Sequence, residues 1–316
     1  MDVSDDLEAG LVGRRNVVAV GIGRELLPAL LAARRRTDGG TWRLLCSSAV
    51  VDALGRAFVL GTDLATWAAD GGGIDLRTSD GPATDRTLIA TPDRGIALTG
   101  PEGNRTLLVE RAVGGGSEDG EDDGTGDGVE NGVERLRRTA RAWFDGGTPA
   151  TVGMPSRERL ASSARSALDE RFAAELTAVL DALGPGDLDR SQPVTDRTLL
   201  VALAARHDHL FNDVGTWAAS VGVSPRQTLT ADRRALERGG LIETVKVPMG
   251  IGHPHYRLRA VDEGLLRVPP ARLVDLLRDR LGDVGAGGAG AGGSTEAGGG
   301  APSRPVNDRP VWDRKP

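Results

Sequence analysis

The chain has 316 residues, of which 39% are hydrophobic and only 3% aromatic, so it is long enough for about two domains with cores built mainly from Ala, Val and Leu. Its formal net charge is −6 at pH 7, but residues 114–134 alone carry eight acidic side chains and no basic one. The rest of the chain holds the other 37 of the 45 acidic residues and all 39 basic ones, so its net charge is +2. The acidic total therefore does not exclude a nucleic-acid partner, whereas the single Cys46 excludes an internal disulfide.

Two further features of the composition concern the source and the compartment. Only Lys246 and Lys315 among the 39 basic residues are lysines, which is typical of a GC-rich, salt-adapted source. No window approaches ~18 uninterrupted apolar residues and the N-terminus is acidic, so a soluble, cytoplasmic protein without a membrane partner is expected. Cys46 lies in the apolar run WRLLCSSAVV, which predicts a buried, inert thiol.

Residues 1–113 alternate between strand-like and helix-like patterns. The apolar run at 16–23 predicts a buried strand, and the segment 24–36, which ends in three arginines, predicts a helix. A second strand is expected next at 41–48, followed by two helices at 49–59 and 63–70. Four short strands are then expected at 74–79, 86–91, 95–100 and 105–110. This order predicts an α/β domain with a mixed sheet that is partly antiparallel at one edge.

Two glycines that follow the first strand, Gly21 and Gly23, stand where backbone amides meet an anion in nucleotide-binding folds. Leu26 occupies the third glycine position of G-x-G-x-x-G, and no acidic residue ends a clear second strand. The pattern therefore favours a tight turn over a dinucleotide site, and no cofactor is expected. A degenerate sensor domain for a small metabolite and a dimerisation platform are both open interpretations of this domain.

Two regions beyond this domain have no apolar period. Residues 114–132 form an acidic, Gly-rich insert and residues 283–316 a Gly-rich tail, and both are predicted to be disordered. Residues 133–190 are expected to form a helical connector with a helix at 133–144 and one long helix at 156–183, whose apolar residues recur every three to four positions. The Gly- and Pro-rich break that follows marks the start of another domain.

The region 191–282 opens with the pattern of a helix-turn-helix. Thr195 is predicted to cap a first helix, and Asn212 or Asp213 a second one. Gly222 is predicted to end the second helix in the left-handed conformation. Two helices joined by a short turn that contains Gly are typical of this motif.

A third helix and a hairpin complete the pattern of a winged helix. Ser224 is predicted to cap the third helix, with Pro225 in its first position. Strands at 241–248 and 256–260 follow, joined by a glycine-bearing loop that would form the tip of the wing. Three helices followed by a hairpin predict a C-terminal winged helix-turn-helix domain.

Polar residue types at the start of the third helix point to double-stranded DNA as a partner. Arg226 and Gln227 match the bidentate contacts that read guanine and adenine, and Arg233, Arg234 and Lys246 are suited to phosphates. The candidate DNA-binding residues are Ser224, Arg226, Gln227, Thr228, Thr230, Arg233, Arg234, Lys246, His253 and His255.

Two alternatives to DNA binding remain open at this point. Residues 195–262 hold nine basic and seven acidic side chains, so the net charge of the module is only +2. The arginines are equally able to pair with Asp232 and Glu237 on a solvated helix face. A winged helix also serves in some proteins as a protein-interaction module.

All four histidines lie in this region, as one pair at 207 and 209 and another at 253 and 255. Two His-x-His pairs raise the question of a metal, but the pairs lie at opposite ends of the module and the only cysteine is far away in sequence, so no metal site is expected. His253 and His255 are predicted to lie at the wing tip near phosphate, and His207 and His209 at a helix end.

Two segments, WRLLCSSAVVDALGRAFVLGTDLATWAADG at 42–71 and LIETVKVPMGIGHPHYRL at 241–258, resemble the haloarchaeal TrmB-suppressor (TbsP-like) transcriptional regulators. The resemblance covers residues 15–280 apart from the insert. It implies a sequence-specific regulator that binds promoter DNA of central carbon or sugar metabolism genes, with a sensor-like N-terminal domain that senses a metabolite or mediates dimerisation. Two-fold DNA readers need a dimer, and the helix at 156–183 is a candidate seam for a homodimer.

The rival hypothesis is an enzyme or ligand-binding protein that uses its α/β domain and keeps the winged helix as an accessory. Residues 1–113 hold no histidine and no lysine, and Asp52, Asp63 and Asp75 form no recognisable catalytic pair. No enzymatic activity is therefore expected.

Overall fold

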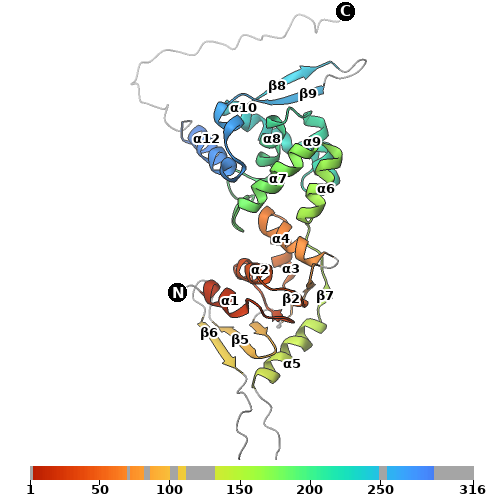
Figure 1. Ribbon diagram of the computed structural model, residues 1–316, viewed down its shortest axis with the longest axis vertical. Coiled ribbons are helices and arrows are strands. Elements are labelled where there is room, and N and C mark those ends of the chain that lie inside the picture. The colour runs from red at the N-terminus through yellow and green to blue at the C-terminus, as the bar shows by residue number, and fades with distance from the viewer. Residues whose placement is uncertain are drawn as a thin grey trace, which may run out of the picture.

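A computed structural model of the protein describes residues 3–69, 72–81, 86–99, 106–111, 132–248 and 255–287, and it shows two units arranged along the long axis of the molecule (Figure 1). A sheet with helices on both faces makes up the first unit, and helices with a two-stranded hairpin make up the second. The insert up to residue 131, the wing loop with His253, and the tail after residue 287 lie outside the described residues, and so do the predictions made for them.

The first unit is built on a seven-stranded sheet with the strand order β6-β5-β4-β1-β2-β3-β7. Strands β1, β2 and β3 are parallel, whereas β4, β5 and β6 at one edge and β7 at the other pair antiparallel. The predicted mixed sheet with an antiparallel edge is confirmed. The strands are β1 (Val18–Val20), β2 (Trp42–Cys46), β3 (Ile74–Thr78), β4 (Thr87–Ala90), β5 (Arg94–Thr99), β6 (Thr106–Arg111) and β7 (Thr148–Pro149).

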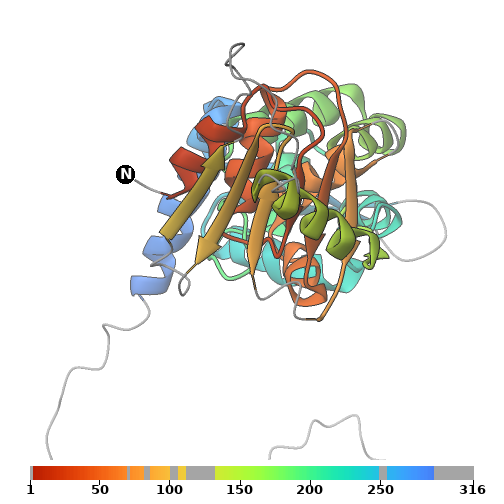
Figure 2. The ribbon, with the colours of Figure 1, turned by 90° about the horizontal axis from the view of Figure 1, so that it is seen from below.

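Alternate side chains of the central strands supply two apolar faces. Ala19 and Leu44 pack against the N-terminal helices, whereas Val18, Val20 and Leu45 pack against a single helix on the other side. Figure 2 shows this single helix, α5, across one face of the sheet and the N-terminal helices on the opposite face. The helices of this unit are α1 (Val3–Leu11), α2 (Leu27–Arg35), α3 (Ser48–Leu54), α4 (Phe58–Ala68) and α5 (Gly132–Asp145).

Helices α3 and α4 differ from the predicted elements. The helix expected at 49–59 ends at Leu54, and α4 begins at Phe58, five residues before the expected start of the next helix. Between them Ala57 has a non-helical backbone and forms a β-bridge with Asp189 in the connector. This long-range pairing ends one helix and starts the other, and local sequence does not signal it.

A tight turn and a buried thiol agree with the sequence interpretation. Gly21 follows β1 with a φ angle of +66°, and its carbonyl accepts a hydrogen bond from the Thr87 hydroxyl at 2.7 Å. Cys46 at the end of β2 is fully buried, and burial raises the pKa of its thiol to about 12. The thiol is therefore protonated and inert, as predicted.

The connector differs from the predicted single helix over 156–183, because the structure has two helices there. α6 (Arg157–Ala167) ends before Leu168, and α7 (Glu170–Ala182) begins with Asp169 as its N-cap. The Asp169 carboxylate accepts a hydrogen bond from the Phe172 backbone N–H at 2.7 Å, which satisfies an end group of α7 and separates the helices.

The second unit has the fold of a winged helix, as predicted. Three helices precede an antiparallel hairpin, and the isolated bridge between Leu210 and Arg257 adds a short third segment to its sheet. The last helix continues past the expected boundary at residue 282. The elements are α8 (Asp196–Arg206), α9 (Phe211–Ser220), the 3-10 turn η2 (Arg226–Thr228), α10 (Leu229–Arg238), β8 (Ile242–Val247), β9 (His255–Ala260), α11 (Glu263–Arg267), the 3-10 turn η3 (Pro270–Arg272) and α12 (Leu273–Gly287).

Among the predicted ends of α8 and α9, two are confirmed and one is wrong. Thr195 caps α8 in a capping box with Thr198, and Gly222 follows α9 with a φ angle of +83°. The predicted cap of α9 at Asn212 or Asp213 is wrong, because α9 already begins at Phe211, directly after the extended residue that bridges to the wing.

One apolar core runs through α6, α7 and the winged helix, and it reaches into the first unit. Phe58 and Val59 of α4 belong to it, as does Met154 from the segment before α6. The two units therefore meet through packed side chains. None of the helices in the described residues is long and apolar enough to cross a bilayer.

Candidate nucleic-acid interface

The third helix of the winged helix, α10, is fixed by its buried face. Leu229 and Leu236, seven residues apart, are fully buried, and α10 packs mainly on α8. Asp232 lies on the same face: one carboxylate oxygen accepts a hydrogen bond from the Thr198 hydroxyl at 2.8 Å, and the other lies 3.3 Å from Nε of Arg197. These contacts determine which side chains of α10 face outward.

A 3-10 turn, and not a capped α-helix, leads into α10. Pro225 precedes η2, and the predicted cap at Ser224 is wrong. The Ser224 side chain is nearly buried, and its hydroxyl is hydrogen-bonded to that of Thr228, which also bonds to the Pro225 carbonyl at 2.6 Å. Both hydroxyls are thus engaged inside the turn.

Arg226 and Gln227 are exposed on η2 beside the wing. The Arg226 guanidinium donates a hydrogen bond to the side-chain oxygen of Asn212 in α9. Arg226 and Gln227 line an open concavity of about 510 Å³ together with His255 and Tyr256 of β9. The structure therefore brings together three of the candidate DNA-binding residues, two from η2 and one from the wing.

Arg233, in contrast, is withdrawn from the surface. Its guanidinium carbon lies 5.0 Å from the centre of the Phe211 ring and 5.6 Å from the centre of the Tyr256 ring, and Nε is 3.9 Å from the Glu237 carboxylate. The side chain is only 16% exposed. These cation–π contacts tie α10 to α9 and to the wing, and the structure does not place Arg233 with the exposed candidates.

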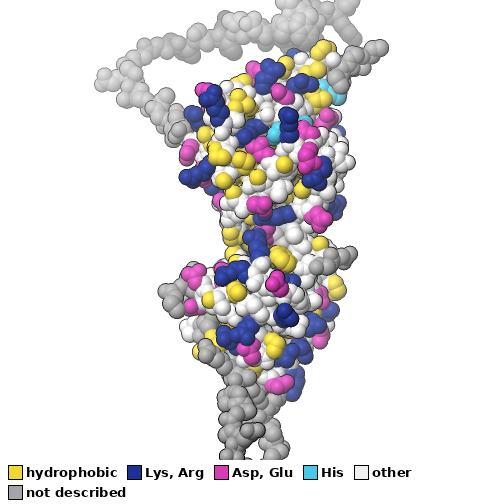
Figure 3. Space-filling view, viewed as in Figure 1, with side chains coloured by type: hydrophobic (Ala, Val, Ile, Leu, Met, Phe, Trp, Pro, Cys, Tyr) yellow, Lys and Arg dark blue, Asp and Glu magenta, His cyan; other side chains and the backbone are white. Residues whose placement is uncertain are grey.

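The remaining described candidates lie around this concavity. Arg234 on α10 and Lys246 on β8 are exposed and form no ion pair with any residue in the described ranges, and Thr230 is half-buried in the first turn of α10. Nδ1 of the half-buried His255 has no hydrogen-bond partner among the described residues. On the face drawn in Figure 3, Lys and Arg are interspersed with Asp and Glu, so no single basic surface covers that face.

Two residues of the site were missed by the sequence analysis. Asn212, which holds the Arg226 guanidinium, was assigned to a helix cap, and Tyr256, which covers Arg233, received no role. No local signal marks either contact, because each joins residues from different elements. The alternation in β9 places Tyr256 on the same face of the strand as the buried Leu258, although the Tyr256 side chain itself stays 38% exposed.

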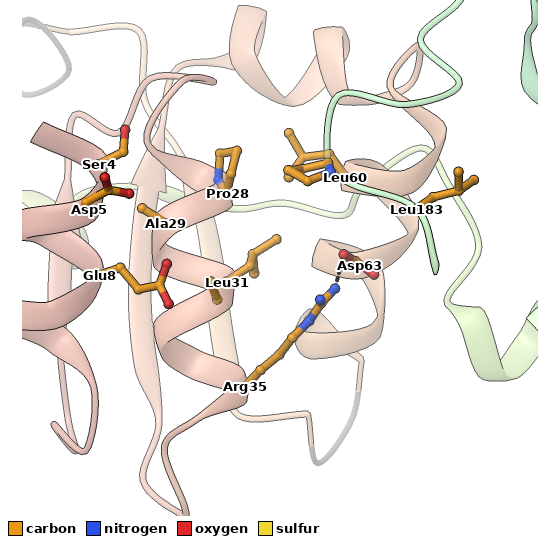
Figure 4. Close-up of a pocket in the computed structure, with 12 residues that line it drawn as sticks. Ser4, Asp5, Glu8, Pro28, Ala29, Leu31, Arg35, Leu60, Asp63 and Leu183 are labelled. Atoms are coloured by element: carbon orange, nitrogen blue, oxygen red, sulfur yellow. Dashed lines mark hydrogen bonds and ion pairs between the residues drawn. The ribbon is translucent and has the colours of Figure 1, made fainter. Parts of the chain in front are cut away.

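A second hollow lies where the two units meet (Figure 4). It has a volume of about 300 Å³ and is lined by α1, α2 and α4 of the first unit and by Leu183 and Pro185 of the connector. Asp63 is nearly buried in its wall, where Arg35 and Arg157 both pair with it. The hollow combines an apolar floor with charged groups at the junction between the units.

His207 and His209 join α8 to α7. Nε2 of His207 is 2.7 Å from the Glu175 carboxylate, Nε2 of His209 is 3.3 Å from the Asp169 carboxylate, and both rings meet the Phe172 ring edge-on. Within the described ranges, His, Cys, Asp and Glu form no group of three or more that would hold a metal ion. The first histidine pair therefore fastens the winged helix to the connector.

Acidification is expected to weaken the second unit through His209. Burial lowers the pKa of His209, Asp169 opposes that shift, and His207 adds to it. The unfolded chain has the ordinary pKa of about 6.5, so the stabilisation is complete above that pH and is lost as the pH falls towards the lower folded-state value. Urea unfolding at several pH values measures this loss, which should be smaller in His209→Gln; equal pH dependence in the two proteins would contradict it.

The second unit thus combines three helices, a wing, and Arg and Gln side chains exposed at the start of the third helix. Such a unit defines a winged helix-turn-helix DNA-binding protein.

Comparison with protein-family models specifies the class further. The model for the C-terminal HTH domain of TbsP-like transcriptional regulators matches residues 156–278, and the model for the N-terminal part of these regulators matches residues 1–112. The chain therefore belongs to the TbsP-like transcriptional regulators, which confirms the resemblance, and it is a DNA-binding regulator. No curated protein and no solved structure matches it.

Proposed function

We propose that this regulator places η2 and the first turn of α10 in the major groove of promoter DNA. The observation that carries the proposal is the exposure of Arg226 and Gln227 on a turn whose other polar side chains are engaged inside the fold. The arginine fork matches the guanine edge, and the glutamine amide matches the adenine edge. Asn212 holds the Arg226 fork in place before DNA arrives.

The remaining candidates have two kinds of role in this proposal. Arg234, Lys246 and the wing histidines His253 and His255 contact phosphates, and the threonines at 228 and 230 lie at the same end of the helix. Ser224 and Arg233 act through the fold, because their polar groups are engaged by the turn and by two aromatic rings. In the strong salt that the lysine-poor composition indicates, the Debye length is about 3 Å at 1 M, so binding depends on hydrogen bonds and fit.

Regulation is proposed to respond to metabolism. The target genes belong to central carbon or sugar metabolism in the cytoplasm of a halophilic archaeon, and a small metabolite is the effector. The hollow between the units supports an effector site, because a ligand there touches α1, α2, α4 and the connector at once. This location would let occupancy change how the units sit on each other.

A homodimer is proposed because two-fold operators need two reading units. The apolar residues of α6 and α7 are used by the core within the chain. In contrast, Leu108 and Val109 are exposed on β6, which pairs with only one neighbouring strand in the described part of the sheet. The edge of β6 therefore supports a dimer seam better than the segment 156–183.

Arg226→Ala is expected to weaken binding to the operator by about 1–3 kcal/mol and to relax the base preference at one position. Non-specific binding should change little, because the phosphate contacts remain. Gln227→Ala should relax the preference at a neighbouring base pair. Fluorescence anisotropy with a set of single-base operator variants, at the salt concentration of the source, measures both effects.

Arg238→Ala is the matched control, because Arg238 is also exposed but lies at the opposite end of α10. Its operator affinity should equal that of the wild type. The operator itself comes from a genome-wide binding map recorded with and without a sugar source. A map without enriched promoters in either condition would refute the proposed function.

A further inference from the structure

Two consecutive residues of the segment between α7 and α8, Asp189 and Arg190, together contact both units. The backbone of Asp189 forms a β-bridge with Ala57, and the Arg190 N–H donates a hydrogen bond to the Arg56 carbonyl at 3.1 Å. Arg24, which follows the tight turn after β1, donates a hydrogen bond to the Asp189 carboxylate. Asp189 and Arg190 are thus attached to the sheet unit by backbone and side-chain bonds.

The side chain of Arg190 reaches the helix-turn-helix. Its Nη2 donates to the Val223 carbonyl at 2.8 Å and lies 3.0 Å from the Asp196 carboxylate. Asp196 is the first residue of α8 and is fully buried, and Val223 stands three residues before Arg226. One side chain from the connector therefore joins the first helix to the turn that leads to the exposed DNA-binding candidates.

The charge on Asp189 depends on its partners. Partial burial alone would raise the pKa of its carboxyl group, but hydrogen bonds from Ser191 and Arg24 outweigh this effect and hold the pKa below its usual range. The Asp189 side chain is 13% exposed and that of Arg24 is 43% exposed. The pair is therefore ionised, and loss of the more exposed Arg24 should not unfold the protein.

Open space separates the two units beside this contact. A groove of about 360 Å³ has Gly55 of the first unit on one side and Gly222 and Pro225 of the helix-turn-helix on the other, and Arg190 lines it. The buried Met154 also lines the groove and belongs to the apolar core that includes Val223, so the Arg190 side chain adds a polar connection between the sheet unit and the turn to this apolar packing.

We propose that Arg24, Asp189 and Arg190 form a positioning relay through which the sheet unit sets the helix-turn-helix turn for DNA binding. The inference rests on the proposed function, since it takes Arg226 and Gln227 as the residues that read the operator. The three relay residues touch no DNA themselves. They hold the carbonyl of Val223, and thereby the start of η2, at a fixed place relative to the sheet.

The test measures operator affinity of the full-length chain by fluorescence anisotropy, with a duplex from the most enriched promoter fragment. Arg24→Asp sets a second carboxylate against Asp189 and is expected to weaken binding roughly 2- to 30-fold, the usual range for residues that couple distant sites. Arg24→Lys keeps the charge and should restore most of the affinity. The urea midpoint should be unchanged in both variants, while amide hydrogen exchange at residues 221–228 becomes faster in Arg24→Asp.

Arg36→Asp is the matched control, because Arg36 is another exposed arginine of the sheet unit but pairs with Glu8 of α1, and not with a residue of the connector. It should bind like the wild type. Wild-type affinity in Arg24→Asp, or an equal loss in both variants, would overturn the relay, and the proposed function would still stand if Arg226→Ala is impaired. Wild-type affinity in Arg226→Ala as well would refute the proposed function. If Arg24→Asp does not fold, Arg24→Gln removes the charge without repulsion and must show the same loss of affinity.

Discussion

Trp217→Ala is expected to destabilise the second unit by about 3–5 kcal/mol. The indole is 1% exposed, its ring centre lies 5.4 Å from that of Phe172 with the planes at 80°, and Nε1 donates a hydrogen bond to the Ser163 hydroxyl at 3.0 Å. Its removal leaves a cavity where α6, α7 and α9 meet, because the surrounding helices relax only in part. Urea unfolding followed by far-ultraviolet circular dichroism measures the loss as a lower midpoint with an unchanged slope.

The matched control for this prediction is Trp143→Ala. Trp143 lies in α5 of the other unit and is only partly buried, at the edge of a smaller apolar cluster. Its removal should cost clearly less than that of Trp217. Trp217→Phe keeps a ring but loses the N–H donor, so it should fall between the two. Equal losses from both alanine variants would contradict a central role of Trp217 in fastening α9 to the connector.

The winged helix could be predicted because the signals that set its helix ends are local. Thr195 satisfies its own capping box within three residues, and Gly222 adopts a positive φ angle that other residues reach only with strain. The hairpin likewise follows from two short strands joined by a glycine-bearing loop. At these two helix ends the deciding contacts lie within a few residues of the chain, so the sequence alone shows them.

Helix ends that depend on distant partners were predicted wrongly. The division between α3 and α4 depends on Ala57 pairing with Asp189, and the early start of α9 depends on Leu210 pairing with Arg257. The division of 156–183 depends on Asp169, whose position in an apolar helical pattern does not reveal that its carboxylate caps a new helix. In each case an interaction outside the local window, or a side-chain orientation, decides the backbone.

Among the candidate DNA-binding residues, exposure that follows from local position could also be predicted, whereas burial by residues from other elements could not. Arg226 and Gln227 are exposed as predicted, because residues at the very start of a helix have few neighbours to cover them. Arg233 lies six residues after Gln227, in the second turn of α10, where rings from α9 and β9 cover it. Residue type alone does not separate an arginine that faces DNA from one that packs on aromatic rings; tertiary contacts do.

Asp232→Ala is expected to destabilise the second unit by about 2–4 kcal/mol and to weaken operator binding as well. The carboxylate is nearly buried between α10 and the first turn of α8, where it accepts from the Thr198 hydroxyl and lies beside Arg197. Alanine leaves that hydroxyl without its acceptor and Arg197 without its counter-charge. Because the same contact sets the rotation of α10, the presentation of Gln227 to DNA should suffer along with stability.

Two variants separate the contributions to this effect. Asp232→Asn keeps the volume and an acceptor for Thr198 but loses the charge opposite Arg197, so its loss should be smaller than that of alanine. Glu263→Ala removes a carboxylate from an exposed ion pair with Arg267 and should change neither stability nor affinity measurably. Urea midpoints and operator anisotropy measure both quantities on the same samples. An Asp232→Ala protein as stable as Glu263→Ala would show that the two leucines of α10 alone hold the recognition helix on α8.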